Sequence, residues 1–223
     1  MTEHFGKVSI IGLGLLGGSL ARAMKARGMC DSVTGCGRNP GRLEFAITHG
    51  IADTVTHDPS DAALGADLVV ICTPVGLIPS VIEKISPRMK HGAIVTDVGS
   101  TKQFIVEQAE KLLPANVHFV GSHPMAGSES AGVEASTLTL FENAICVVTP
   151  SGKTEVQALE RIQSLWESLK CRVMVMSPEE HDTLVAASSH LPHLAAVSLC
   201  QTISSLSADN EKVIPLLAGG FRD

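Results

Sequence analysis

Positive charge and aromatic rings are both scarce in this sequence of 223 residues. Lys and Arg number 17 against 23 Asp and Glu, giving a formal net charge of −6. No broad basic face is therefore available to neutralise a phosphate backbone. Aromatic residues make up 3% of the chain, with one Trp and no Tyr, which is too few for a base-stacking platform. We expect no nucleic-acid partner.

Long apolar runs and paired cysteines are also missing. The longest apolar stretches, around residues 8–11 and 67–73, are far shorter than the roughly 20 residues of a membrane span, and residues 1–7 hold no signal-like apolar segment. Six cysteines are spread singly, without a Cys-x-x-Cys pair, which predicts reduced, mostly buried thiols. We expect a cytoplasmic protein with no membrane partner, zinc site or disulfide framework.

Short apolar runs alternate with helical patterns as far as residue 177. This alternation predicts an α/β fold of the Rossmann type, with a doubly wound, mostly parallel sheet and helices on both faces. The expected strands are residues 7–11, 32–36, 67–73, 93–98, 118–122, 143–149 and 172–176, with a weaker one near 54. The expected helices are residues 19–27, 40–49, 77–85, 102–113 and 154–169.

After Ser177 the pattern becomes all-helical, with helices expected at residues 178–190, 192–207 and 209–217. Pro178 followed by two Glu residues is typical of a helix start. We therefore predict one domain at residues 1–177 and the start of an all-helical domain at 178–223.

The first expected strand runs directly into Gly12-Leu13-Gly14-Leu15-Leu16-Gly17-Gly18-Ser19. A G-x-G-x-x-G between a strand and a helix is the dinucleotide fingerprint: the glycines allow a tight turn, close approach of the pyrophosphate and close helix packing. The sequence thus predicts a site for NAD or NADP that uses Gly12, Gly14, Leu15, Leu16 and Gly17. A purely structural glycine-rich turn is the alternative.

The end of the second strand favours NADP over NAD. Gly37 stands where an NAD-specific site carries a carboxylate for the ribose 2′-OH. Arg38, beside it, can pair with a 2′-phosphate. The alternative is that Arg38 is a solvated surface residue.

Three more strand ends carry candidate residues, because ligands of open α/β sheets bind beyond the carboxyl ends of the strands. Thr73 and Pro74 are expected to shape the wall against the nicotinamide ribose, or simply to end a strand. Ser100 suits a substrate contact, but taken alone a helix N-cap is favoured.

His123 suits proton transfer during hydride loss, and a structural role stays open for it. Glu129 follows in a long loop, where it would orient or gate His123 or lie on the surface.

Other chemistries do not match the spacing. There is no G-x-S-x-G elbow, and residues 127–132 lack the Lys-Ser/Thr of a P-loop. His190 and His193 are three residues apart, as metal ligands can be, but no carboxylate or Cys lies in register with them. We predict no metal, and substrate-anion binding or helix packing remains open for these two residues and for His181.

Taken together, these motifs resemble the prephenate/arogenate dehydrogenases, the oxidative decarboxylases of tyrosine biosynthesis. The resemblance runs along the whole chain. It rests on the glycine motif, Cys72-Thr73-Pro74, Asp97-Val98-Gly99-Ser100-Thr101-Lys102, Gly121-Ser122-His123-Pro124-Met125-Ala126-Gly127-Ser128-Glu129, Glu180-His181-Asp182 and Ser189-His190-Leu191-Pro192-His193.

The resemblance implies an NAD(P)-dependent enzyme acting on prephenate or arogenate. His123 would draw the proton of the substrate's C4 hydroxyl as hydride passes to the nicotinamide, and loss of CO2 would restore aromaticity. Ser100 would hold the same hydroxyl, Glu129 would gate the pocket, and three histidines would line it, namely His181, His190 and His193. The alternatives are a pyrroline-carboxylate or β-hydroxyacid type of reductase and a non-catalytic dinucleotide-binding or regulatory module.

Members of this family anchor a substrate carboxylate with an Arg beyond the segment Gly219-Gly220-Phe221-Arg222-Asp223, and continue with helices that form a dimer. The resemblance therefore implies that residues 178–223 are the N-terminal part of a substrate and dimerisation domain cut short at Asp223. We expect apolar surface exposed over residues 192–217, poor turnover by the chain as it stands, and a homodimer when the helical domain is complete.

Overall fold

The computed structural model describes residues 3–209, 212–218 and 221. By internal contacts the chain divides into two compact units, Met1–His181 and Asp182–Asp223. The first unit contains the sheet and its helices. The second is helical. The domain boundary expected after Ser177 stays a prediction.

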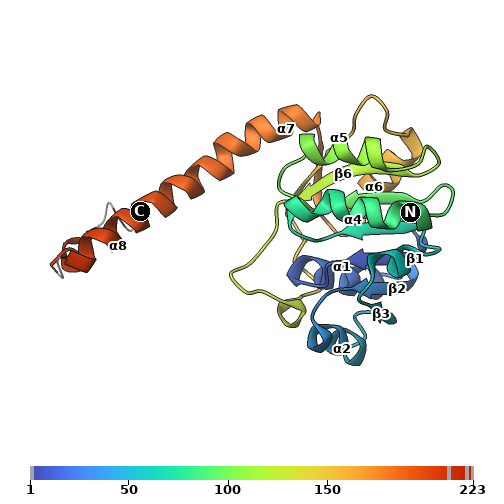
Figure 1. Ribbon diagram of the computed structural model, residues 1–223, viewed down its shortest axis with the longest axis horizontal. Helices are drawn as coiled ribbons and strands as arrows, with labels where there is room; N and C mark the ends of the chain where they lie inside the picture. The colour runs from blue at the N-terminus through green and yellow to red at the C-terminus, as the bar shows by residue number, and fades with distance from the viewer. Residues whose placement is uncertain (1–2, 210–211, 219–220, 222–223) are drawn as a thin grey trace. The chain divides into compact units, whose positions relative to one another are not determined.

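The first unit is built on an eight-stranded sheet with the order β3-β2-β1-β4-β5-β6-β7-β8 (Figure 1). The strands are β1 (Phe5–Ile11), β2 (Cys30–Cys36), β3 (Thr54–Thr56), β4 (Leu68–Ile71), β5 (Ile94–Asp97), β6 (His118–Pro124), β7 (Ile145–Thr149) and β8 (Arg172–Val175). Neighbouring strands from β3 to β6 are parallel, β6 and β7 are antiparallel, and β7 and β8 are parallel. The predicted Rossmann-type, mostly parallel sheet is confirmed.

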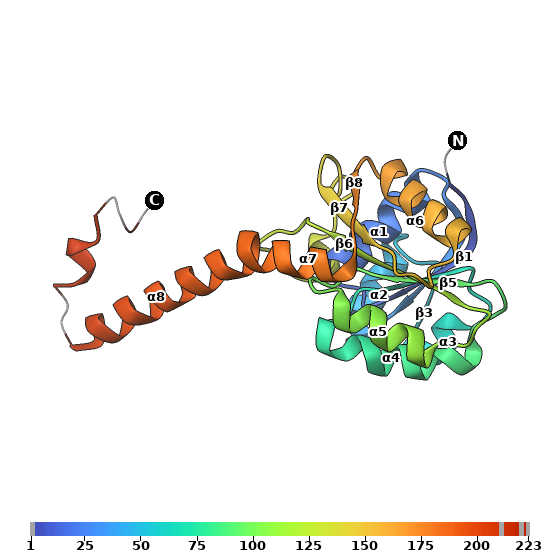
Figure 2. The same ribbon diagram turned by 90° about the horizontal axis from the view of Figure 1, so that it is seen from above.

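Helices cover both faces of this sheet (Figure 2). One core packs α1 (Leu15–Ala26), α2 (Pro40–Thr48) and α6 (Val156–Ser168) against the strands. The other contains residues of α3 (Pro59–Ala63), α4 (Ile78–Ile85) and α5 (Gln103–Leu112). In β4, Val70 faces the first core and Ile71 the second, so successive side chains are buried on opposite faces. Burial on both sides explains why the central strands are continuous apolar runs.

Helix α3 was not anticipated, because five residues are too few to show helical periodicity. A local signal was present all the same. Asp58 precedes Pro59, and its side chain accepts a hydrogen bond from the backbone N–H of Ser60 at 2.9 Å. An Asp cap followed by Pro in the first turn is a common helix start.

The residues expected in helices at 178–190 and 192–207 are helical, but the predicted break between the two helices is wrong. Helix α7 (Pro178–Val185), a π-helical turn η4 (Ala186–His190) and α8 (Leu191–Asp209) follow one another without a break. Pro192 has no N–H, and in a regular α-helix its ring would collide with the carbonyl of residue i−4. The wider π-helical turn just before Pro192 lets the helix continue past it. The helix expected at 209–217 is reduced to a 3-10 turn, η5 (Ile214–Leu216), with residues 210 and 211 outside the described part.

The continuous helix made of α7, η4 and α8 is apolar and exposed. Residues Pro178–Ser207 form a 30-residue helix whose most apolar window has a mean hydropathy of 1.2 and is 6% buried. By length and composition alone it could cross a membrane, so the expectation that no segment reaches that length is wrong. Ser, Thr and His interrupt its apolar residues and hid it from a search for runs. A single such helix is a weak sign of a membrane span, because core helices of soluble proteins pass the same test.

Exposed apolar side chains continue through this unit, as the sequence led us to expect. They include Leu194, Val197, Leu199, Leu206, Ile214 and Leu216. What covers them stays a prediction.

Trp166 offers a test of the core beneath α6. Its ring is fully buried and lies edge-on to Phe141, with ring centroids 5.4 Å apart. The indole Nε1 has no hydrogen-bond partner among the described residues. We expect Trp166→Ala to lower the free energy of unfolding by about 3–5 kcal/mol. Trp166→Phe should cost clearly less, because it removes no hydrogen bond and leaves a smaller cavity. Denaturant unfolding measures both, and equal losses would contradict the packing described.

Candidate nucleotide-binding and active site

The glycine turn between β1 and α1 lies where two strand ends meet. Gly12 has φ +108°, and a Cβ there would lie 2.6 Å from the carbonyl oxygen of Cys72. The backbone N–H groups of Gly12 and Leu13 donate to the carbonyl of Cys36, at 2.8 and 3.2 Å. The turn is thus tied to the ends of both β2 and β4, at the point where the strand order reverses. This is where open α/β sheets bind their ligands.

The other two glycines of the motif differ in what surrounds them. A Cβ on Gly17 would lie 2.3 Å from the carbonyl oxygen of Gly12, so this position is closed by backbone. A Cβ on Gly14 would meet no atom within 4 Å. Gly14 is also the N-cap of α1 and brings no side chain to the first helical N–H groups. Open space beside an uncapped helix N-terminus fits a pyrophosphate group.

Thr73 supplies a second indication that a ligand belongs at this edge. It follows β4 beside the glycine turn, with its backbone N 3.0 Å from the Cβ position of Gly12. In the part of the chain that the structure describes, its buried Oγ1 has no hydrogen-bond partner. A buried hydroxyl of this kind usually finds a partner in water or a ligand. Pro74 follows it, and Leu15 and Leu16 open α1 in half-buried positions.

Arg38 lies exposed just beyond the carboxyl end of β2. Arg42, in the first turn of α2, adds a second guanidinium that sequence reasoning missed. Its Nε lies 3.8 Å from the Glu134 carboxylate, and both side chains are about half exposed, so this ion pair is weak. The available signal was the spacing: Arg42 follows Arg38 by four residues across a Pro40 helix start.

A charged pair is buried where β5 and β6 end. The side chains of Asp97 and Lys102 are both 0% exposed and form an ion pair. Lys102 Nζ also donates to the carbonyl of Ser122 at 2.9 Å. The Ser122 N–H donates to Asp97 Oδ1 at 3.2 Å, and the Gly99 N–H donates to Oδ2 at 2.9 Å. The sequence placed an ammonium at a helix start, and nothing in it marked this Lys as buried.

Ser100 lies exposed between the two members of that pair. Helix α5 begins at Gln103, and its N-cap is Lys102. The favoured N-cap role of Ser100 is therefore wrong, because the helix starts too far along the chain. The hydroxyl stands instead on the segment that leaves the carboxyl end of β5.

His123 lies inside β6 rather than beyond it, because antiparallel pairing with β7 extends this strand to Pro124. Its Nδ1 is 2.9 Å from Nε2 of His181 in α7, and the two rings meet edge-on at 73°. His181 is fully buried, and His123 is half-buried. One imidazole must donate to the other, so proton exchange between His123 and a ligand would use Nε2. Sequence reasoning did not find this contact, which joins residues 58 positions apart.

The structure gives only the exposure of the remaining predicted contact residues. Glu129 is exposed in the connection between β6 and β7. His190 and His193 are exposed in the second unit. The expected roles of these residues, and of His181 as a pocket residue, stay predictions. Among the described residues, no three His, Cys, Asp or Glu side chains are placed to hold a metal ion.

The connection that carries Glu129 is fixed on α1. Ser136 Oγ accepts a hydrogen bond from Arg22 Nε at 2.8 Å, and the N–H of Thr137 donates to Ser19 Oγ at 3.0 Å. A Cβ on Gly18 would lie 2.8 Å from Val133. The helix that follows the glycine turn therefore also supports the segment that follows His123.

The thiols near these strand ends are not activated. Burial and, to a smaller extent, the charge of Asp58 raise the pKa of Cys36 to about 11. Burial also raises the pKa of Cys72 and Cys146 well above the ordinary thiol value. Such thiols stay protonated at neutral pH and are poor nucleophiles.

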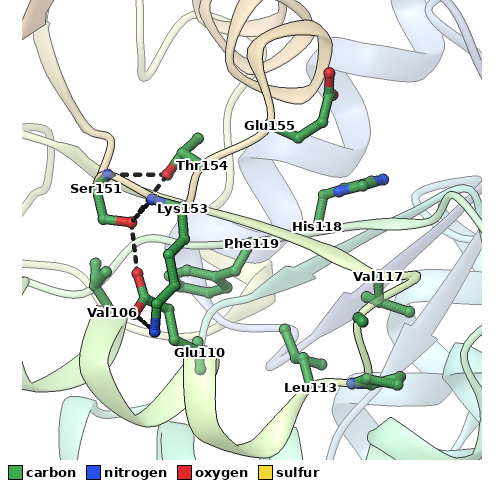
Figure 3. A pocket seen from close by; sticks show the side chains of 13 residues that line it. Val106, Glu110, Leu113, Val117, His118, Phe119, Ser151, Lys153, Thr154 and Glu155 are labelled. Carbon is green, nitrogen blue, oxygen red and sulfur yellow. Dashed lines mark hydrogen bonds and ion pairs between the residues drawn. The ribbon is translucent and has the colours of Figure 1, made fainter.

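A cavity of about 160 Å³ lies at the opposite end of β6 and was not anticipated (Figure 3). Glu110 on its wall is paired with Lys153 at 3.1 Å and accepts a hydrogen bond from Ser151. Burial alone would raise the pKa of Glu110, but these two partners hold it below its usual value. Glu155 caps the N–H groups of Gln157 and Ala158. Glu110 and Glu155 on the cavity wall therefore have structural partners within the fold.

The parallel sheet, the glycine turn at the reversal of strand order and the polar groups at the same edge define a nucleotide-binding Rossmann protein. The sequence model for "Prephenate dehydrogenase, nucleotide-binding domain" matches residues 20–175, and that for "Prephenate dehydrogenase, dimerization domain" matches residues 177–223. The chain belongs to the prephenate dehydrogenase family, and the resemblance noted in the sequence is confirmed.

Individual relatives agree with this assignment. The chain is 37% identical to prephenate dehydrogenase of Bacillus subtilis over 100% of its length and 60% of that protein. It is 36% identical to cyclohexadienyl dehydrogenase of Zymomonas mobilis, covering 98% of the chain and 75% of the relative. The crystal structure of prephenate dehydrogenase from A. aeolicus with hydroxyphenyl propionate and NAD+ superposes with a TM-score of 0.91 at 33% identity, over 100% of this chain and 78% of the other. The chain thus spans about three fifths of the B. subtilis relative.

Gly14 and Gly17 separate dinucleotide binding from folding. We expect Gly14→Ala to raise the Kd for NADP and NAD by about tenfold, or ~1.4 kcal/mol, because the methyl group enters the open space. Its Tm should not change. Gly17→Ala should lower the Tm, since its methyl group meets backbone at 2.3 Å. Fluorescence titration and thermal unfolding measure the two effects. Unchanged dinucleotide affinity in Gly14→Ala would show that the pyrophosphate does not lie there.

Proposed function

We propose that the protein is an NAD(P)-dependent dehydrogenase that oxidatively decarboxylates prephenate to 4-hydroxyphenylpyruvate, or arogenate to tyrosine. The observation that carries the proposal is the His123–His181 pair. Its His123 lies in β6, whose carboxyl end is at the same edge of the sheet as the glycine turn. Membership of the prephenate dehydrogenase family supports it. The cofactor, when bound, supplies the hydride acceptor.

In this proposal His123 acts as the base. Its Nε2 takes the proton of the C4 hydroxyl while the C4 hydrogen leaves as hydride, so that a carbonyl forms. The bond between the ring and its carboxylate then breaks and CO2 departs. The electron pair of that bond restores the aromatic ring, and His123 returns its proton to the oxygen. The proton and hydride are thereby both accounted for.

His181 orients this base in the proposal. If Nδ1–H of His123 donates to Nε2 of His181, the tautomer is fixed with its lone pair on Nε2, as a base requires. The same contact keeps a hydrogen-bond acceptor on the imidazolium that forms. Burial of His181 limits the movement of both rings.

The other site residues take the roles that the family resemblance implies. Ser100 would hold the substrate hydroxyl and the nicotinamide, and its exposure leaves it accessible. Glu129 would gate the pocket, with His190 and His193 near the substrate side chain. Gly12, Thr73 and Pro74 would contact the cofactor, together with the neighbouring residues Gly14, Leu15, Leu16 and Gly17.

NADP is the proposed cofactor form. Support comes from Gly37, which offers no carboxylate at the end of β2, and from the exposed guanidinium of Arg38 beside it. Arg42, four residues further on and weakly paired with Glu134, would add positive charge near a 2′-phosphate in this proposal.

The assembly and location complete the proposal. The match to a dimerization domain and the exposed apolar residues of α8 support a homodimer formed through residues 178–223, with residues 1–177 binding the dinucleotide. All six cysteines are free thiols, which is typical of a reducing compartment such as the cytoplasm.

His123 tests the reaction. We expect the wild-type chain to reduce NADP or NAD with prephenate or arogenate, and His123→Asn to lower kcat by about 100-fold or more with unchanged dinucleotide affinity. His118→Asn, at the opposite end of β6, is the matched control and should keep its activity. Cofactor binding without turnover of either substrate would favour a non-catalytic module. Full activity in His123→Asn would contradict the assigned base.

Arg38 tests the cofactor form. Loss of a charge-assisted hydrogen bond costs about 1.5–3 kcal/mol, so Arg38→Ala should raise the Kd for NADP by roughly 10- to 100-fold. The Kd for NAD should change little. The exposed Arg88, at the other end of the sheet, is the control. Calorimetric titration with both cofactors gives the comparison, and equal losses for the two would refute the preference for NADP.

A further inference from the structure

The reaction described above makes no use of the most deeply buried charges near the site. Asp97 and Lys102 are both 0% exposed. Removing two charges from water carries a large desolvation cost, and a buried ion pair is often no more stabilising than apolar residues of the same size. Fold stability alone therefore does not explain an ion pair at this position. The segments that the pair holds in place offer a better explanation.

The pair links the two segments that carry the proposed catalytic groups. Asp97 accepts hydrogen bonds from the N–H of Gly99 and the N–H of Ser122, which directly precede Ser100 and His123. Lys102 spans the same gap, because its Nζ contacts both the Asp97 carboxylate and the Ser122 carbonyl. Each member thus binds the β5 side and the β6 side at once.

The pair stands where backbone pairing stops. The register of β5 with β6 ends at Thr96 opposite Val120, and beyond it side chains make the connection. Ser122 Oγ donates to the carbonyl of Asp97 at 2.6 Å and lies 2.9 Å from Thr96 Oγ1. The Asp97 carboxylate thus connects the two strands beyond Thr96 and Val120, the last pair joined by backbone hydrogen bonds. It can accept several hydrogen bonds at once, which a neutral side chain of that size cannot.

Gly99 makes room for the pair, and Gly121 packs beside it. A Cβ on Gly99 would lie 2.8 Å from Asp97 Oδ2, and one on Gly121 would lie 3.6 Å from Lys102 Cδ. Both segments therefore pass close to the charged groups, so a shift of the pair would move the backbone before Ser100 or His123.

We propose that Asp97 and Lys102 are positioning residues, which hold the Ser100 hydroxyl and the His123 imidazole at the spacing that the reaction requires without touching substrate or cofactor. This inference rests on the proposed function. A buried, multiply bonded ion pair suits the task because it resists displacement more strongly than neutral hydrogen bonds do.

Three variants and a control test the proposal in the full chain. Lys102→Met and Asp97→Asn each break the pair, and the double variant Asp97→Asn/Lys102→Met removes both charges. Arg27→Met is the matched control, because it breaks the partly buried Arg27–Glu142 pair between α1 and the β6–β7 connection. For each protein we would measure the Tm, the Kd for NADP, and kcat and KM with the substrate that the wild type accepts.

We expect both single variants to lose Tm and about 100-fold in kcat, the scale of a misplacement near 1 Å, with the Kd for NADP within about twofold of wild type. The double variant should regain Tm, since no unpaired charge is left buried, but it should not regain kcat. Arg27→Met should lose Tm and keep its kcat.

Recovery of kcat together with Tm in the double variant would overturn the positioning role and leave the proposed function standing. So would a loss of kcat in Arg27→Met as large as in Lys102→Met. If the single variants do not fold, the double variant still decides. A wild-type chain that turns over neither substrate would instead overturn the proposed function, and the role of the pair in that reaction with it.

Discussion

The close approach of backbone at Gly12 is the constraint on which the candidate site depends. A Cβ there would meet the carbonyl of Cys72 at 2.6 Å, so β1 and β4 can end side by side only around a glycine. Because neighbouring strands from β3 to β6 run parallel, every other chemical group of the site then reaches the same edge. The segments after β2, β4 and β5 and the end of β6 converge there as a consequence of strand direction.

The sequence predicted the features that depend on local rules. Strand positions, the glycine turn and the placement of Ser100 and His123 at one edge all follow from apolar periodicity and from the parallel sheet. The contacts between distant residues could not be predicted in the same way. Nothing near His123 in the chain identifies His181 as its partner, and nothing near Lys102 shows that its ammonium is enclosed. Burial is decided by what packs against a residue, and that is settled only in the fold.

In the second unit the sequence prediction was wrong for a different reason, because the local rule that proline ends a helix did not hold. Pro192 predicts a helix end, yet the π turn from Ala186 to His190 carries the helix across it. The same continuity brings apolar residues that are scattered in the sequence onto one 30-residue helix. This exposed helix lies within the residues that match a dimerization domain, which is why the proposed homodimer is formed through it.

The proposed role of His123 as a base depends on how its ring is held. A carboxylate on Nδ1 would stabilise the imidazolium of His123 strongly, whereas the partner here is another imidazole. The Asp97 carboxylate is paired with Lys102 and accepts hydrogen bonds from the backbone N–H groups of Gly99 and Ser122. In the proposed function, the hydrogen bond to His181 orients the ring of His123, which takes the substrate proton and later returns it. In the proposed function, what these buried groups supply to the reaction is fixed geometry.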